Sequence, residues 1–244
     1  MRKIKTLFRP TLALIVAAAF FSCNGPKKTG AADSTTATKP AAAAAAKPNA
    51  SSLKAPFDVV EITHTVKDFD KWQPVFKEDS TARKAAGLTD IVVGRNADST
   101  NKVMVVLNAS DVAKAKAFAA DPRLKDAMTK GGVSSKPDVA YFHVIRFNAD
   151  SHEKTWIVVT HKVKDFDAWV KVFDGEGTAK RVSQGMVDVV LARGIDDPNL
   201  VHIVFDITDM AKAKAAIFSD EKKKLMMSAG VEGKPEIAIY KSVE

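Results

Sequence analysis

The part of this chain that is expected to fold consists of an internal repeat of two similar segments. His64–Trp72 reads HTVKDFDKW and returns 97 residues later as His161–Trp169, HKVKDFDAW. Ala113–Ala117 reads AKAKA and returns 98 residues later as Ala211–Ala215, so one residue has been inserted between the two landmarks. A repeat of this length exceeds a solenoid unit and has the size of a small domain. We therefore expect two copies of one domain that pair with each other, with any site depending on that pairing.

Residues 1–22 have the pattern of a signal peptide. Four basic side chains lie within residues 1–9, an apolar run covers residues 12–21, and Ser22-Cys23 follows. The apolar run is too short for a comfortable membrane-spanning helix. Phe20-Phe21-Ser22-Cys23 resembles a bacterial lipoprotein cleavage site, with Phe20 where such sites usually carry leucine. The resemblance implies that Cys23 becomes a lipidated N-terminus that anchors the protein to a membrane. The alternative is an ordinary secretory signal with an incidental cysteine.

Residues 23–56 are expected to form a disordered tether. An alanine run at 41–46 lies between Pro40 and Pro48, and Lys, Ser, Thr, Gly and Asn fill most of the remainder. Such a segment has little to bury beyond alanine methyl groups. Asn24 follows the cysteine where some bacteria read aspartate as an inner-membrane retention signal. The resemblance therefore favours the outer membrane, facing the periplasm.

The formal charge of +8 belongs to these leading segments. Residues 1–22 carry four basic and no acidic side chains, and residues 23–56 carry five lysines against one aspartate, so each segment contributes +4. Subtracting both from +8 leaves residues 57–244 neutral. Nucleic-acid binding needs a basic field over the folded surface, so we expect no nucleic-acid partner. Cys23 is the only cysteine, which leaves no disulfide framework and no thiolate metal site.

Each repeat has the pattern strand, helix, strand, strand, helix, strand. Phe69, Trp72 and Phe76 recur at helical spacing after the first strand, and Asp68 or Asp70 can cap that helix. Proline is expected to kink or delay the first helix at Pro74 and to interrupt the second near Asp121-Pro122. The predicted strands are 59–66, 89–95, 102–108 and 138–147 in the first repeat and 156–163, 187–193, 200–207 and 236–243 in the second. The helices of the second repeat are expected at 165–184 and 209–229.

A βαββαβ unit forms a four-stranded antiparallel sheet with both helices on one face. The other face is too apolar here to meet water. Its predicted apolar positions are Val92, Met104, Val106, Val139, Tyr141, Ile145, Val158, Val190, Val204, Ile237 and Ile239. The second copy is the expected cover, because two such sheets can face each other and close into a barrel. The predicted fold is α+β: two fused ferredoxin-like repeats, 57–147 and 156–244, form an intramolecular α+β barrel in a monomer.

At this point the chain resembles the dimeric α+β-barrel superfamily, which includes antibiotic-biosynthesis-monooxygenase-like domains. The resemblance is carried by the ferredoxin-like order and by the two passages that begin at His64 and His161. Members usually pair two chains, whereas the two units are fused here. The superfamily hosts many unrelated chemistries, so the resemblance implies a fold more than an activity.

His64 and His161 interrupt an apolar strand face at the same repeat position. One interpretation is a proton-transfer or ligand-contacting imidazole near the barrel end, because histidine titrates near neutral pH. The alternative, which we favour, is a structural histidine that hydrogen-bonds the helix start at Asp68 or Asp165.

His202 suggests a different site. Strand alternation turns His202 and Asp206 into the inter-sheet space, where the first repeat has Met104 and Asn108. Polar groups inside an apolar cavity are what a small-molecule site needs. The residues that can line one asymmetric pocket are His202, Asp206, Asn108, Glu61 and Thr160. The alternative is that Asp206 is exposed at its strand end and His202 is a satisfied interior residue.

Arg95 and Arg193 match between the repeats, each before the same turn. Their guanidinium groups suit a carboxylate or phosphate ligand, but pairing with Asp98 and Asp196 is the favoured interpretation. The five histidines show no metal-ligand spacing, and the sequence has no dinucleotide, phosphate-loop or nucleophile-elbow motif. The sequence therefore predicts neither a metal site nor a cofactor.

Two functions are compatible with these features. The favoured one is a cell-envelope lipoprotein whose barrel binds a small apolar or amphipathic molecule between the sheets or serves a structural role. The other is an enzyme resembling the cofactor-independent monooxygenases of the superfamily, with His202 or His64 and His161 handling protons. A clustered, buried His–Asp pair beside an open cavity favours the enzyme. A filled inter-sheet space favours a structural or protein-interaction role and counts against both small-molecule interpretations.

Overall fold

The structure, a computed structural model, describes residues 52–151 and 153–243. The predicted signal peptide, the predicted lipidation site at Cys23 and most of the predicted tether lie outside the described residues. The first repeat contains β1 (Phe57–Thr65), α1 (Phe69–Glu78), α2 (Ser80–Ala85), β2 (Leu88–Asn96), β3 (Lys102–Ala109), α3 (Val112–Ala119), α4 (Pro122–Lys130) and β4 (Asp138–Phe147). The second contains β5 (Thr155–Val163), α5 (Phe166–Glu176), α6 (Thr178–Ser183), β6 (Met186–Gly194), β7 (Leu200–Ile207), α7 (Met210–Ile217), α8 (Asp220–Ser228) and β8 (Val231–Ser242).

Aspartate side chains cap five of the eight described helices. Asp68 accepts hydrogen bonds from the backbone N–H groups of Asp70 and Lys71, and Asp165 accepts one from Ala168. Such caps satisfy N–H groups that have no partner inside the helix. The predicted interruption before Pro122 is confirmed, because α3 and α4 are separate helices.

The first helical segment of each repeat differs from the prediction. Continuous helices were expected, but α1 ends at Glu78 before α2, and α5 ends at Glu176 before α6. The break lies at Asp79 in the first repeat and at Gly177 in the second, whose positive φ of 85° interrupts the helix. The helix expected over 209–229 is likewise divided, into α7 and α8. Pro74 lies within α1 and does not end it.

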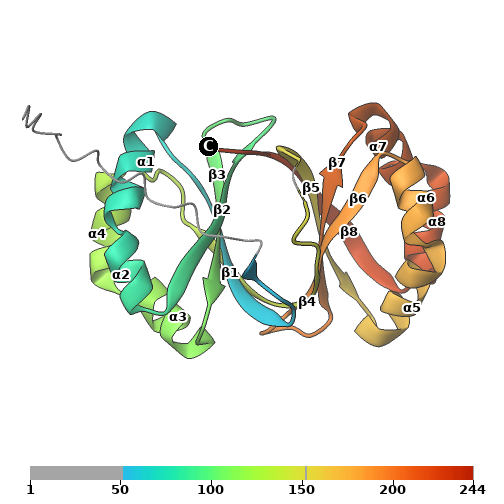
Figure 1. The fold of residues 1–244 in the computed structure, drawn as a ribbon, viewed down its shortest axis with the longest axis horizontal. Coiled ribbons are helices and arrows are strands. Elements are labelled where there is room, and N and C mark those ends of the chain that lie inside the picture. Colours follow the sequence, from blue (N-terminus) through green and yellow to red (C-terminus); the bar gives the residue numbers. More distant parts are fainter. Residues whose placement is uncertain (1–51, 152, 244) are drawn as a thin grey trace, which may run out of the picture. The chain divides into compact units, whose positions relative to one another are not determined.

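The eight strands form one closed antiparallel barrel in the order β1-β3-β2-β8-β5-β7-β6-β4. Each repeat contributes four neighbouring strands, and β2–β8 and β4–β6 join the repeats. Figure 1 shows the two sheets facing each other, with α1–α4 on one flank and α5–α8 on the other. The predicted fold, two fused ferredoxin-like repeats that form an intramolecular α+β barrel, is confirmed.

The inner face of the barrel is the predicted one in five strands and the opposite one in the last strand of each repeat. Val92, Met104, Val106, Val158, Val190 and Val204 lie inside, whereas Val139, Tyr141, Ile145, Ile237 and Ile239 pack with the helices. In β4 the pairing of Val59 with Phe142 and of Glu61 with Ala140 turns Phe142 and Ala140 inward. The prediction was wrong there because both faces of these strands are apolar, so alternation does not distinguish them.

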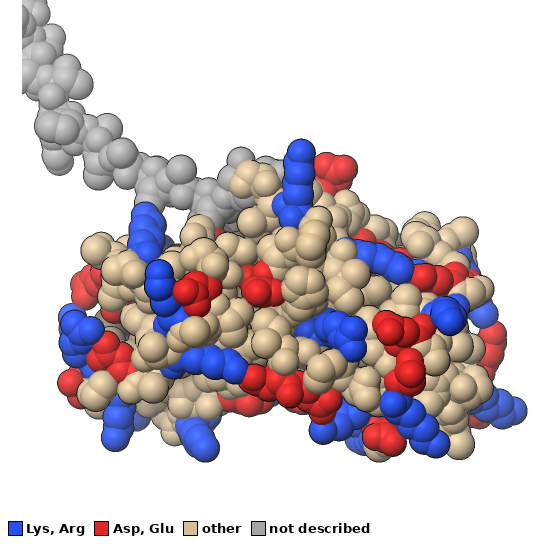
Figure 2. Space-filling model, turned by 90° about the horizontal axis from the view of Figure 1, so that it is seen from below, with Lys and Arg blue, Asp and Glu red and all other residues tan. Residues whose placement is uncertain are grey.

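The surface carries both signs of charge. Figure 2 shows Lys and Arg side chains interspersed with Asp and Glu over the face in view. This mixture agrees with the neutral charge of residues 57–244. Within the described residues, no helix combines the length and apolar character needed to cross a membrane.

Candidate functional site

The inside of the barrel holds a cavity of about 500 Å³. Most of its wall is apolar, with polar side chains gathered at two places: a buried pair, Glu61 and His202, and the end where the linker between the repeats passes. The apolar wall residues are Phe57, Val59, Ile91, Val92, Met104, Val106, Val144, Phe147, Trp156, Val189, Val190 and Val204. The inter-sheet space is therefore open and is not filled by side chains.

Glu61 and His202 meet across the barrel. His202 Nε2 lies 3.5 Å from Glu61 Oε2, and the two side chains are 6% and 15% exposed, respectively. The other ring nitrogen, Nδ1, shares a hydrogen bond of 3.0 Å with Thr160 Oγ1, and the imidazole stacks on Phe142 at 4.3 Å between ring centres. β1 supplies the glutamate and β7 the histidine, so the pair forms only when the two repeats close the barrel.

Burial opposes charge on both members of this pair. It raises the pKa of Glu61 to about 8, with a further contribution from the nearby carboxylates of Asp138 and Glu236. Burial lowers the pKa of His202 to about 4. Between these two values the pair holds one proton, whichever group carries it, and has no net charge. It then offers the cavity both a hydrogen-bond donor and an acceptor.

Asp206 lines the cavity but does not contact His202. It accepts hydrogen bonds from Ser151 Oγ and, at 3.4 Å, from the backbone N–H of Glu153. Both donors belong to the linker 148–154 between the repeats, whose residue 152 is not described. Asp206 is 4% exposed, so the alternative that it is exposed at its strand end is wrong. Asp206 anchors the linker at one end of the cavity.

Only some of the other predicted pocket residues reach the cavity. Met104 contributes to the cavity wall, and Thr160 holds His202 from behind the wall. Asn108 lies beyond the cavity and donates from Nδ2 to the carbonyl oxygen of Asp58 at 3.2 Å. The structure therefore brings Glu61, Met104, His202 and Asp206 to one cavity.

His64 and His161 face away from the barrel interior, into the layers between helices and sheet. The predicted hydrogen bonds to Asp68 and Asp165 are absent: no described protein group bonds either ring nitrogen of either histidine. Each imidazole instead packs on a tryptophan, His64 on Trp72 at 5.5 Å and His161 on Trp169 at 5.4 Å. Burial lowers the pKa of both histidines to about 4.

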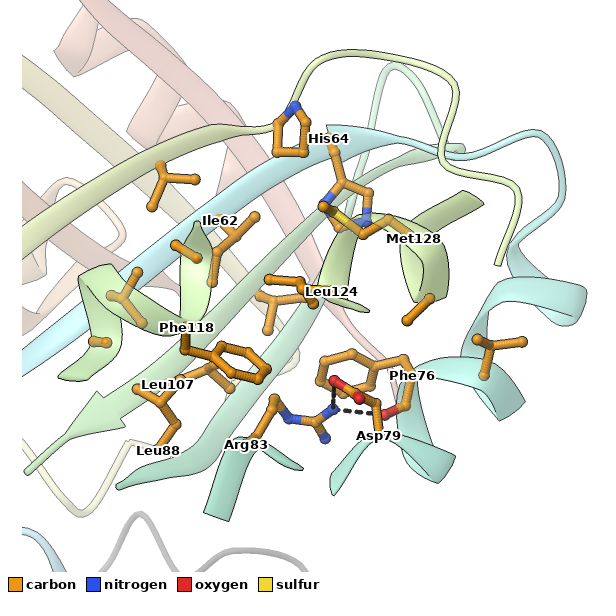
Figure 3. Close-up of a pocket in the computed structure, with 18 of the residues that line it drawn as sticks. Ile62, His64, Phe76, Asp79, Arg83, Leu88, Leu107, Phe118, Leu124 and Met128 are labelled. Atoms are coloured by element: carbon orange, nitrogen blue, oxygen red, sulfur yellow. Dashed lines mark hydrogen bonds and ion pairs between the residues drawn. The ribbon is translucent and has the colours of Figure 1, made fainter. Parts of the chain in front are cut away.

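His64 borders a second cavity, of about 250 Å³, between the helices and the sheet of the first repeat. Figure 3 shows His64 near Ile62 and Met128 on one side, with Arg83 and Asp79 on the other. The corresponding space beside His161 measures only about 70 Å³. At an offset of 98, Ala119 and Ala127 are replaced by Ile217 and Leu225, whose larger side chains fill it.

Arg95 and Arg193 do not form the predicted pairs with Asp98 and Asp196. Arg95 Nε donates to the carbonyl oxygen of Thr100 at 2.7 Å, and Arg193 Nε donates to that of Pro198 at 3.0 Å. Each guanidinium lies over a phenylalanine at the start of a helix, Phe69 at 4.3 Å and Phe166 at 4.5 Å. Neither arginine lines one of the cavities found among the described residues.

Two buried arginines, Arg83 and Arg181, were not predicted from the sequence. Arg83 donates from Nε and Nη2 to both carboxylate oxygens of Asp90 at 2.8 Å, and Arg181 binds Asp188 in the same way. Both are 3% exposed or less. The two arginines lie 98 residues apart, the same offset as other matching positions of the repeats, and this match could have identified them. It is hard to see because Arg83 precedes a lysine, whereas Arg181 follows one.

Comparison with known proteins supports the fold. No family model and no curated protein matches the chain. An anthrone oxidase-like protein superimposes with a TM-score of 0.55 at 14% identity, over 78% of this chain and 93% of the other. A candidate monooxygenase from Fusobacterium nucleatum subsp. nucleatum gives 0.52 at 11% identity, over 78% and 94%. Another from Lactobacillus acidophilus NCFM gives 0.49 at 15% identity, over 76% and 94%. At these identities the first two establish a shared fold and no more.

Among the described residues, no three His, Cys, Asp or Glu side chains converge in a way that would hold a metal ion.

Proposed function

We propose that this protein binds a small apolar or amphipathic molecule inside the barrel. The observation that carries the proposal is the cavity of about 500 Å³, whose mostly apolar wall carries a largely buried acid–base pair, Glu61 and His202, away from the polar linker end. An apolar cavity of about 150 Å³ is enough to bind benzene. A compound of two fused rings therefore fits the barrel. An apolar wall with a few placed polar groups is the usual composition of a small-molecule site.

The test is direct binding of 1-naphthol to the full chain carrying Cys23→Ser, which removes any lipid adduct. Native mass spectrometry and isothermal titration calorimetry should show one bound molecule per monomer. Val204→Phe places a ring inside the cavity and should weaken binding at least tenfold. Val182→Phe is the matched control, because Val182 lies on the surface of α6 and is 49% exposed. Absence of binding to the parent protein, or equal loss in both variants, would contradict the proposal.

We further propose that the barrel is a monomeric lipoprotein of the cell envelope, held by a lipid on Cys23 at the outer membrane and facing the periplasm. The basic start, apolar run and Ser22-Cys23 junction support this location. A clickable palmitate analogue should label the protein produced from the full chain in bacteria, and Cys23→Ser should abolish the label. Retention of the label in that variant would refute the anchor.

A second candidate is a cofactor-independent, monooxygenase-like enzyme, and the observation that favours it is His64. This imidazole borders a cavity of about 250 Å³ and bonds no described protein group. A substrate in the cavity can be its first hydrogen-bond partner, and negative charge developing on that substrate would raise the pKa of His64 from about 4 towards the range of a proton acceptor. Two structural neighbours named for oxidase or monooxygenase activity support the same possibility. The test is oxygen uptake with anthrone. His64→Leu should abolish it and His161→Leu should not, because the cavity beside His161 is only about 70 Å³.

A further inference from the structure

The Glu61–His202 pair has a symmetry counterpart in the barrel, and that counterpart is apolar. At the repeat offsets of 97 and 98, Glu61 corresponds to Val158, and His202 corresponds to Met104. Val158 and Met104 pack together in one buried cluster with Trp156 and Tyr240. The same junction between repeats is therefore built once from two apolar side chains and once from an acid and a base. The scaffold does not require polar groups at this junction.

The two polar side chains share a geometry suited to a single ligand group. Thr160 engages His202 at Nδ1, which leaves Nε2 as the ring nitrogen on the side of Glu61 and the cavity. The distance of 3.5 Å between Nε2 and Oε2 is long for a hydrogen bond, so neither group is fully satisfied by the other. A hydroxyl placed beside both can donate to one and accept from the other, whichever of the two holds the proton.

The surroundings of the pair disfavour an anionic ligand. The exposed carboxylates of Asp138 on β4 and Glu236 on β8 add negative charge near Glu61 that solvent screens in part, and Tyr240 carries its phenol close to the same carboxyl. At the linker end, Asp206 adds a third carboxylate, while Glu153 and Lys154 of the linker carry opposite charges. Within the described wall, the barrel interior thus offers an uncharged ligand hydrogen bonds without repulsion and offers a carboxylate little compensation.

We propose that the barrel recognises an uncharged, ring-sized apolar molecule through one hydroxyl group, which donates to one member of the Glu61–His202 pair and accepts from the other. This inference rests on the proposed function, since it names the ligand class of the same cavity. The ligand class is a phenol or an alcohol on an apolar skeleton, and carboxylic acids of the same skeleton are excluded.

The experiment compares three skeleton-matched probes, 1-naphthol, naphthalene and 1-naphthoate, by calorimetry with the full chain carrying Cys23→Ser. The parent protein should bind 1-naphthol at least tenfold more tightly than naphthalene, because one net hydrogen bond contributes about that factor. It should bind 1-naphthoate more weakly than either. The double variant Glu61→Val/His202→Met copies the existing Val158–Met104 pair and should bind naphthol and naphthalene equally.

The outcomes separate this inference from the proposed function. If none of the three probes binds the parent protein, the proposed function itself fails. If naphthol and naphthalene bind the parent equally, or the double variant keeps the preference for naphthol, the barrel binds ligands but the Glu61–His202 pair does not recognise the hydroxyl. Tighter binding of 1-naphthoate would also overturn the inference, because it would make the pair a cationic site. Circular dichroism confirms that the double variant is folded.

Discussion

Replacing His161 by leucine tests how a buried histidine makes the free energy of unfolding depend on pH. His161 is 5% exposed, packs on Trp169 and bonds no described protein group through either ring nitrogen. Burial lowers its pKa from 6.5 to about 4. The folded protein therefore resists protonating an imidazole that the unfolded chain protonates readily. The resulting stability is fully present above pH 6.5 and is lost as the pH falls towards 4.

The magnitude follows from the shift. Each pKa unit corresponds to about 1.4 kcal/mol, so the full loss for one histidine is about 3 kcal/mol, and about 2–3 kcal/mol is lost by pH 4.5. His161→Leu removes the titrating group and keeps an apolar side chain of similar size. The variant should therefore lose less free energy of unfolding between pH 7 and pH 4.5 than the parent does, by that amount.

The assay is urea denaturation at both pH values, followed by circular dichroism. His64→Leu should give a similar change, since burial lowers the pKa of His64 to about 4 as well. The two histidines lie in separate helix layers, so the double variant should show the sum of the two effects. Parallel losses of stability in parent and variants between the two pH values would refute the reasoning.

Three further perturbations have defined outcomes. Arg83→Met leaves a carboxylate without its bidentate partner and should lower the free energy of unfolding by about 3 kcal/mol in urea denaturation. Gly132→Ala places alanine at a φ of 74° and should cost about 1–2 kcal/mol, whereas Gly185→Ala should cost clearly more, because its Cβ would also lie 2.5 Å from a backbone oxygen. Asp206→Ala removes the anchor of the linker 148–154 and should speed its cleavage in limited proteolysis, with the overall melting temperature changing less than the cleavage rate.

The order of strands and helices was predictable because each element carries a local signal and the repeat provides it twice. The aspartates that cap helices and the proline that separates α3 from α4 act through neighbouring backbone, so the sequence reveals them. Barrel closure was predictable for another reason. A sheet face with Val92, Met104 and Val106 needs an apolar cover, and the second repeat offers one.

What depends on the pairing of distant strands was harder to predict. The faces of β4 and β8 were assigned the wrong way round, since Tyr141 and Phe142 are equally suited to burial and only the register with β1 distinguishes them. The alternation of side chains correctly predicted that Glu61 and His202 lie on the inner face. It could not predict their contact, which requires closure of the barrel. The cavity beside His64 depends on the small side chains of Ala119 in α3 and Ala127 in α4. No local sequence pattern shows whether neighbouring elements fill the space beside a small side chain.

Fusion of the repeats explains why the barrel can be polar on one side only. In a dimer of identical chains, a glutamate at position 61 and a histidine at the position of Met104 would each occur twice, and two acid–base pairs would face the same cavity. Each such pair removes polar groups from water at a cost that an apolar pair avoids. The fused chain keeps one pair, Glu61–His202, and replaces the other by Val158–Met104.

The two helix layers also differ at symmetry-related positions. The first repeat keeps an open cavity of about 250 Å³, where Leu124 borders it, and the second places Lys222 at that position, ion-paired with the buried Glu176. One repeat thus retains open space and the other holds a charged contact that occupies it. A chain with two independently varying copies can place one polar pair between the sheets and leave the symmetry-related position apolar. Of the two symmetry-related positions, only the one with Glu61 and His202 offers hydrogen bonds to a ligand hydroxyl, which favours one orientation of the ligand in a nearly symmetric chamber.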